Sequence, residues 1–288
     1  MVTTLVLPEI FLGVNYIMSS SFTDLQTFWE CPRRLGFRKL GYKPVASPVA
    51  VTTGQFVHEG LQAFFIGGAL DSDWATQAVA RARNEATLRI DRVTDKEMHS
   101  KFIRSTNEAS DRALKLLSHY FDSYANDYRC PIPEVELKHA NVICHVDLLA
   151  EFKDELAVVD FKTTKSPDIR WYDFSGQCDV YSYVLVEQKN PIGFIVYDII
   201  SEEGLFRHIR KPNLEKGKRL FRQISTLGNY TPKMLLGEPQ CQWGCPQCDY
   251  FYPCWLWETG EPKGAVEYLT KNYVYTDLTQ EVVRNETH

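Results

Sequence analysis

The sequence predicts an α/β fold in which a sheet of five strands is flanked by helices. Long helical patterns fill the first half of the chain, and strand-like alternation is concentrated between residues 133 and 210. The most informative stretch, residues 142–165, predicts two short strands joined at the polar turn Lys153-Asp154-Glu155. Because a chain of 288 residues with 44% hydrophobic content can bury a sizeable core, we expect an ordered globular protein.

The helical part begins at a capped helix. Ser21 followed three residues later by Asp24 is typical of a capping box. Apolar spacing predicts further helices at residues 54–66, 71–93, 96–128 and about 174–187, and we interpret 71–93 and 96–128 as a lid or wall over a cleft. The remaining strands are expected at residues 133–139, 192–200 and 204–210, of which the last two should pair. Residues 1–18 predict an added strand or an arm.

The two strands of residues 142–165 bring charged side chains together. Side chains alternate across a strand, so Asp160 and Lys162 point the same way. If the chain turns at Lys153 and Asp154, Asp147 lies directly opposite Asp160. Opposed carboxylates have Cβ atoms about 4.5–5.5 Å apart and repel each other, so a cation between them is favoured. Oxygen ligands suit Mg²⁺ or Mn²⁺, and the sequence therefore predicts a divalent metal site with a lysine beside it. The alternative is a solvated sheet edge on which the lysine is an ordinary counter-ion.

Four other residues are candidates for this site, and each has a purely structural alternative. Glu136 would add an acid, although a solvated strand face explains it nearly as well. His58 lies at the margin of an apolar helix face, where a hydrogen-bonded core histidine is the commoner explanation. Gln177 and Tyr181 lie one turn apart on one helix face, where the first can be solvated and the second packed.

A basic run begins in the last predicted strand and continues beyond it. Its members are Arg207, Arg210, Lys211, Lys216, Lys218, Arg219 and Arg222. Their density indicates a phosphate-facing surface, although an exposed basic helix is the usual explanation. Because the chain has a net charge of −5, contacts with nucleic acid would depend on such local patches.

Several protein classes are disfavoured by the sequence. It contains no apolar run of about eighteen residues and no basic segment followed by an apolar stretch and a cleavage site. We therefore expect no membrane span and a cytoplasmic location. A G-x-x-x-x-G-K-[ST] loop is also lacking, so no ATP motor is visible.

The cysteines give the strongest chemical signal. Cys241, Cys245, Cys248 and Cys254 lie close together, and thiols so arranged in a reducing compartment require a partner. A local zinc site would use all four. An iron–sulfur cluster also needs four thiolates, but one can come from elsewhere in the chain. The distant Cys31 would by itself more often be a buried core thiol, and spacing alone leaves both metals open.

Together these residues form a pattern that extends over residues 19–258. In order, it consists of Cys31, His58, Glu136, Asp147, Asp160-x-Lys162, Gln177-xxx-Tyr181 and Cys245-x2-Cys248-x5-Cys254. This pattern resembles the iron–sulfur branch of the PD-(D/E)XK nucleases, which includes RecB-like and AddB-like exonuclease domains and CRISPR-associated RecB-like exonucleases. Two positions depart from it, because Val146 stands where proline is common and Cys144 where glycine is frequent.

The resemblance implies a restriction-endonuclease-like mixed sheet flanked by helices, with an iron–sulfur clasp. It also implies roles for individual residues. His58, Asp147, Asp160 and the Phe161 carbonyl would bind the catalytic metal. Cys31, Cys245, Cys248 and Cys254 would hold a 4Fe–4S cluster, leaving Cys241 spare. Lys162 would position or polarise the attacking water, and Gln177 and Tyr181 would line a groove on the DNA side.

From these observations we predict a metal-dependent nuclease that hydrolyses DNA phosphodiesters. The small size and the missing motor favour an exonuclease or end-processing nuclease that acts on single strands or ends, with a protein partner that supplies a motor or an integrase. Polarity and endo versus exo preference stay open. Recombination, CRISPR adaptation and phage DNA metabolism all remain open as its process. The rival is a non-catalytic DNA-binding or assembly subunit with a structural zinc site. We expect one domain over residues 1–288, comprising a cysteine-containing helical part (19–130), the catalytic sheet (131–210), a basic helix with the cysteine cluster (211–260) and a tail (261–288).

Overall fold

The computed structural model describes residues 19–66, 72–93, 95–165, 167–237, 245 and 248–275. The predicted arm at residues 1–18 and the end of the predicted tail lie outside these residues. The chain divides into two compact units. The sheet unit takes its described residues from 45–139 and 143–221, and the terminal unit takes its own from 1–44, 140–142 and 222–288. The expectation of a single domain stays a prediction.

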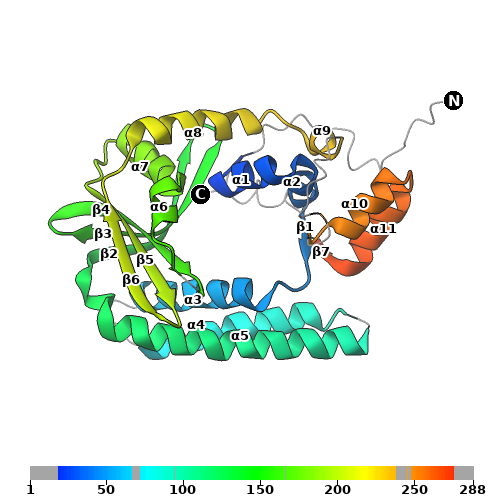
Figure 1. Cartoon of the computed structure of the whole chain (residues 1–288), viewed down its shortest axis with the longest axis horizontal. Helices are drawn as coiled ribbons and strands as arrows, with labels where there is room; N and C mark the ends of the chain where they lie inside the picture. The colour runs from blue at the N-terminus through cyan, green and yellow to red at the C-terminus, as the bar shows by residue number, and fades with distance from the viewer. Residues whose placement is uncertain are drawn as a thin grey trace, which may run out of the picture. The chain divides into compact units, whose positions relative to one another are not determined.

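A five-stranded mixed sheet organises the sheet unit, as the sequence predicted (Figure 1). The strands follow the order β2-β3-β4-β5-β6. Strand β3 is antiparallel to β4, β4 is parallel to β5, and β5 is antiparallel to β6. Their bounds are Arg129–His139 for β2, Val142–Phe152 for β3, Glu155–Thr163 for β4, Phe194–Ser201 for β5 and Gly204–Arg210 for β6.

The turn between β3 and β4 fixes the register of the hairpin. Lys153 and Asp154 both adopt positive φ, at 52° and 63°, as a two-residue hairpin turn requires. The ladder therefore pairs Phe152 with Glu155 and, further along, Leu148 with Val159. Continuing this register by one residue brings Asp147 opposite Asp160, which agrees with the predicted alignment.

Three helices pack on one another and on one face of the sheet. They are α3 (Val49–Ile66), α4 (Ser72–Ile90) and α5 (Lys96–Ser123), and a short 3-10 helix, Ala125–Asp127, follows them. Buried apolar side chains of these helices form one core with Leu148, Val159 and Phe161 of the sheet. Helix α3 begins before the predicted residue 54, since Thr52 and Thr53 are buried and continue its packed face.

The opposite face of the sheet carries α6 (Arg170–Phe174) and α7 (Gln177–Glu187), which Figure 1 shows across the strands from α3–α5. Helix α8 (Leu214–Leu227) packs closely against α7, which is possible because Gly217 has no side chain. A Cβ atom there would meet the carbonyl oxygen of Asp179 at 2.2 Å. These contacts place the start of α7 directly over the middle of the sheet.

The terminal unit is mainly helical. The capping box of Ser21 and Asp24 begins α1 as predicted. A small two-stranded sheet pairs β1 with β7 in antiparallel fashion. The elements of this unit are α1 (Phe22–Glu30), α2 (Pro32–Lys39), β1 (Tyr42–Pro44), α9 (Pro232–Leu236), α10 (Phe251–Glu258), α11 (Pro262–Asn272) and β7 (Tyr273–Tyr275). In the part of the chain that the structure describes, no helix is both long and apolar enough to cross a membrane.

Candidate active site

Asp147 on β3 is held by partners from two other elements. Its Oδ2 accepts a hydrogen bond of 2.8 Å from the backbone N–H of Phe161 on β4. Its Oδ1 lies 3.5 Å from Nδ1 of His58 on α3. Burial raises the pKa of Asp147. The hydrogen bond and charge of His58 and the charge of Lys162 together outweigh this effect, so the pKa of Asp147 is below its usual range. The carboxylate is thus kept charged and fixed in direction, as a metal ligand requires.

Three ligating side chains meet at this point. One ligand atom each of His58, Glu134 and Asp147 lies within 4.8 Å of the other two. Burial lowers the pKa of His58, and the hydrogen bond and charge of Asp147 raise it above its ordinary value. Burial and the charge of Asp147 raise the pKa of Glu134. Two carboxylates and an imidazole form a donor set that fits Mn²⁺ or Mg²⁺, and the cation would relieve the repulsion between the acids.

The acid in this cluster is Glu134 and not Glu136, which differs from the sequence prediction. Glu136 instead forms an ion pair of 2.8 Å with Lys138 and lies 4.0 Å from His145. Regular alternation directs Glu134 and Glu136 to the same side of β2, and both find their partners there. Glu136 approaches His145, whereas Glu134 approaches Asp147, two residues further along β3. The position along the strand, and not the face, therefore separates the two acids. The sequence marks Glu134 only as an acid two residues upstream, after a proline.

Asp160 and Lys162 form a close ion pair on β4 beside the three ligands. Nζ of Lys162 lies 2.6 Å from Oδ2 of Asp160, which is only 1% exposed. Burial raises the pKa of Asp160, while the charge of Lys162 opposes this. Burial lowers the pKa of Lys162, but the charges of Asp160 and Asp147 raise it to well above its ordinary value. The ammonium therefore stays protonated at neutral pH.

Gln177 at the start of α7 orients Lys162. Nζ of Lys162 donates to Oε1 of Gln177 at 3.4 Å, and Nε2 of Gln177 donates to the hydroxyl of Tyr181 at 2.6 Å. Tyr181 is buried and accepts a hydrogen bond from Gln177. The sequence placed it in a groove on the DNA side, whereas its ring is enclosed by the protein. Phe161 likewise directs its ring into the core, where it stacks on Phe65. Ligation by the Phe161 carbonyl stays a prediction.

A hollow of about 500 Å³ borders the site. It is lined by the first turns of α3 and by the end of β4, namely Ala50, Val51, Gly54, Gln55, His58, Glu59 and Thr163. Gly54 allows α3 to approach β4, since a Cβ atom there would lie 2.8 Å from the hydroxyl of Thr163. His58 thus faces both the carboxylates and an open space that can admit a substrate.

Arg207 does not face solvent, contrary to its predicted contact with DNA. Its guanidinium pairs with the fully buried carboxylate of Asp198, at 2.6 Å from Nε to Oδ1, and with Asp127. The hydroxyls of Tyr120 and Tyr128 also donate to Asp198, each at 2.8 Å. The physical reason is that a buried carboxylate requires a counter-ion, and Arg207 supplies it.

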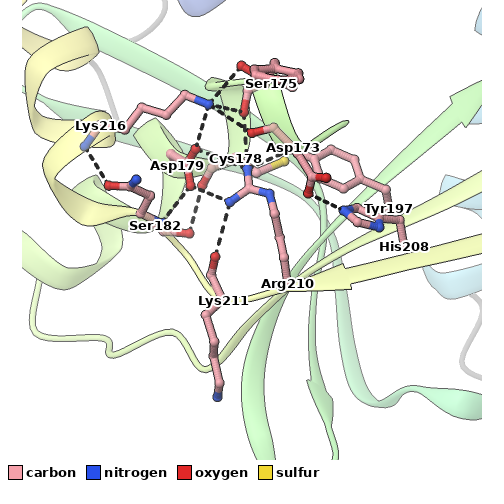
Figure 2. A network of polar contacts seen from close by, with 12 residues as sticks. Asp173, Ser175, Cys178, Asp179, Ser182, Tyr197, His208, Arg210, Lys211 and Lys216 are labelled. Atoms are coloured by element: carbon pink, nitrogen blue, oxygen red, sulfur yellow. Dashed lines mark hydrogen bonds and ion pairs between the residues drawn. The ribbon is translucent and has the colours of Figure 1, made fainter. Parts of the chain in front are cut away.

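Arg210 has the same kind of partner. Figure 2 shows its guanidinium with Asp179, which is fully buried; Nη1 lies 2.7 Å from Oδ1. Lys216 lies 3.5 Å from the same carboxylate. Lys211 is 63% exposed and forms an ion pair of 3.2 Å with Glu155. Of the three proposed DNA contacts in this run, only Lys211 remains accessible.

All four predicted cluster cysteines belong to the terminal unit, and their ligation of a metal group stays a prediction. Cys31 lies at the junction of α1 and α2, and burial raises the pKa of Cys248. The neighbouring Arg33 lies 3.5 Å from the sulfur of Cys254 and also binds the carbonyl of Leu236 at 2.7 Å.

The fourth thiol, Cys245, is tied to Cys248, whose N–H donates to the carbonyl of Cys245 at 3.0 Å. Cys241, the extra thiol of the zinc alternative, lies outside the described residues.

Comparison with known proteins agrees with the geometry. A family model described as PD-(D/E)XK nuclease superfamily matches residues 19–254, which contain every residue of the candidate site and the cysteine group. No curated protein matches the chain. Among solved structures, the chain is similar to one described as the crystal structure of SSO0001. The identity is 15%, the match covers 56% of this chain and 78% of that chain, and the TM-score is 0.33.

Proposed function

The chain belongs to the PD-(D/E)XK nuclease superfamily, whose members are generally nucleases, and we propose that it is a DNA exonuclease acting on single strands or ends. The observation that carries this proposal is the arrangement of five side chains in one place. Asp147, Asp160 and Lys162 come from paired strands, and His58 and Glu134 complete the group.

Four side chains and one backbone carbonyl would bind the metal. His58, Glu134, Asp147 and Asp160 would hold Mg²⁺ or Mn²⁺, the metals that nucleases of this superfamily typically use, together with the Phe161 carbonyl. When bound, such a metal lowers the pKa of a water molecule and neutralises charge that builds on the phosphate. The backbone N–H of Phe161 keeps Asp147 aimed at the site.

Lys162 acts as a fixed cation. Its proton is retained because the neighbouring carboxylates raise its pKa, so it suits orienting a water molecule or stabilising a phosphate oxygen better than removing a proton. Gln177 limits the directions in which the ammonium can point. Together these contacts preorganise positive charge where negative charge develops in the transition state.

We further propose that Cys31, Cys245, Cys248 and Cys254 hold a 4Fe–4S cluster. Support comes from Arg33, which connects the helix that follows Cys31 to the helix that contains Cys254. We also propose a protein partner that supplies a motor or an integrase. Recombination, CRISPR adaptation and phage metabolism are the processes that fit this chemistry.

Cleavage of labelled DNA by the purified protein in Mn²⁺ tests the activity. We expect shortening of single-stranded or end-labelled substrates, no reaction in EDTA, and recovery after Mn²⁺ is restored. The rival function, a non-catalytic DNA-binding or assembly subunit with a structural zinc, predicts binding without cleavage under every metal condition. The Asp160–Lys162 pair fits both functions, because a buried carboxylate needs its counter-ion in an inert protein too, and the cleavage assay decides between them.

A further inference from the structure

Two large aromatic side chains are exposed on α6, beside the candidate active site. Trp171 is 71% exposed and Phe174 is 76% exposed. They are three residues apart in a helix, so they lie on the same face. Neither position serves the core, and together the two rings form a small apolar patch on the surface of the helix.

The helix that carries these rings is firmly anchored. Asp173 Oδ1 lies 2.8 Å from Nε2 of His208 on β6, and Figure 2 shows this contact beside the Arg210 network. Lys216 donates to the carbonyl oxygens of Phe174 and Ser175, at 2.8 and 3.1 Å. Anchoring from β6 and α8 means that the two rings are presented by a rigid support and not by a freely moving loop.

Helix α6 is also close to the catalytic residues. Tyr172, between Trp171 and Asp173, packs its ring on Tyr197 of β5 with a centroid distance of 5.0 Å. Tyr197 is the direct strand partner of Asp160. The charges of Lys162 and Asp160 both reach the Tyr172 phenol. The helix that carries the exposed rings is therefore packed beside the site through Tyr172, while the two rings lie on its solvent side.

We propose that Trp171 and Phe174 form a stacking site for unpaired bases of a single-stranded DNA end. Every base offers an aromatic face, so such a site accepts any sequence. Bases within a duplex stack on one another and cannot offer these faces, so the site selects single strands over blunt ends. This inference rests on the proposed nuclease function and specifies its substrate.

The size and the surroundings of the pair favour a base over a protein. Two aromatic side chains expose at most about 300–500 Å², whereas a stable protein interface buries about 1,200–2,000 Å². Arg170, on the same helix, is 82% exposed at its side chain, and Lys165 just before it is also exposed, which suits a phosphate backbone beside the stacked bases. Asp168 holds Arg170 through two hydrogen bonds, at 2.8 and 2.7 Å, and so fixes its position.

Binding of a fluorescent single strand, measured by anisotropy in EDTA so that no cleavage occurs, tests this inference. Trp171→Ala and Phe174→Ala should each raise Kd by about five- to one-hundred-fold, the range of one lost base stack. An abasic strand of equal length keeps the phosphates and removes the bases, so wild type and both variants should bind it equally. Trp74→Ala, which removes a ring that is 50% exposed on α4, is the matched control and should change nothing.

Equal Kd values for wild type and the double alanine variant on the normal strand would overturn the inference. An equal loss on normal and abasic strands would do so too, because the rings would then act without bases. If wild type self-associates and the double variant is monomeric, the pair is a contact between copies. Photocrosslinking of the wild-type protein to a strand containing 5-iodouracil provides a test without variants, and adducts confined to peptides other than the one containing residues 170–174 would count against the site.

Cleavage in Mn²⁺, measured in parallel, separates this inference from the proposed function. Base-dependent binding without any cleavage would refute the nuclease and leave the stacking site intact. Cleavage that is equal for wild type and the double variant on single strands, with equal Kd, would refute the stacking site and leave the nuclease intact.

Discussion

Asp160 and Lys162 show that one ion pair can serve both chemistry and stability. Asp160 is almost completely buried, whereas Lys162 is 31% exposed at its side chain. Removing the charge of Asp160 leaves an ammonium that water can reach. Removing Lys162 leaves a buried carboxylate without its close partner, which is the costlier situation.

We therefore expect different outcomes for two variants of this pair. Asp160→Asn should lower the rate of cleavage in Mn²⁺ by about 100-fold or more and leave the melting temperature nearly unchanged. Lys162→Ala should abolish cleavage as well and also lower the melting temperature. Lys115→Ala, which removes an exposed lysine of α5, is the control for both measurements. Retained cleavage by Asp160→Asn and Lys162→Ala would remove these residues from the active site.

Arg207 illustrates why a basic residue in a charge-rich run need not bind nucleic acid. Arg207→Met would leave Asp198 buried without its cation, and we expect a loss of about 3–5 kcal/mol in the free energy of unfolding. Adding Asp198→Asn should recover part of this loss, since no uncompensated charge then remains. Urea unfolding of the two single variants and the double variant measures the coupling. Reversal of Lys211, which is exposed, is the matched change that should leave stability intact.

At the scale of elements, the pairing of β2 with β3 decides which acid joins the site. Glu134 lies beside His58 and Asp147, while Glu136, two residues further along β2, lies beside His145 and Lys138. The difference between the two acids therefore depends on their position along the strand and not on their chemistry, which is identical.

Two matched substitutions test this difference. Glu134→Gln should raise the Mn²⁺ concentration needed for half-maximal cleavage by about tenfold or more, as loss of a metal-site carboxylate does. Glu136→Gln should leave that concentration unchanged. Titration of cleavage rate with Mn²⁺ gives both values. A larger effect for Glu136→Gln than for Glu134→Gln would restore the original assignment from the sequence.

At the scale of the whole molecule, the cysteines relate distant parts of the chain. A cluster that includes Cys31 and Cys245 closes a loop of most of the sequence. If such a cluster behaves as a cross-link, it stabilises the fold by roughly 5 kcal/mol, mainly by restricting the unfolded chain. A zinc site confined to residues 241–254 would close only a short loop and stabilise less.

Cys31→Ser distinguishes the two metals. With an iron–sulfur cluster, this variant should lose the brown colour of the anaerobically purified protein and melt at a lower temperature, and Cys241→Ser should have little effect. The visible absorption spectrum, iron and zinc analysis and thermal melts provide the readout. A colourless protein that contains one zinc, tolerates Cys31→Ser and is damaged by Cys241→Ser would refute the cluster.

Much of the fold could be predicted because its causes are local. Alternation of apolar residues gives strands, a spacing of three to four gives helices, and the pair Lys153-Asp154 sets a two-residue turn. Since a strand has a side-chain period of two, the turn also fixes which residue opposes which. Asp147, Asp160 and Lys162 could thus be placed together from the sequence alone.

Other features depended on contacts between distant residues. The sequence did not single out Glu134 over Glu136, because the choice depends on which acid lies beside His58 and Asp147 once α3, β2 and β3 have packed. It could not distinguish Arg207 and Arg210 from DNA-binding arginines, because their partners Asp198 and Asp179 become buried only when β5 and α7 pack. Nor did it single out Trp171 and Phe174, whose exposure beside the site is a property of the assembled sheet. Secondary structure follows from the periodicity of neighbouring residues, so it could be predicted from the sequence. Burial and charge pairing depend on contacts between distant residues, so only the tertiary structure decided them.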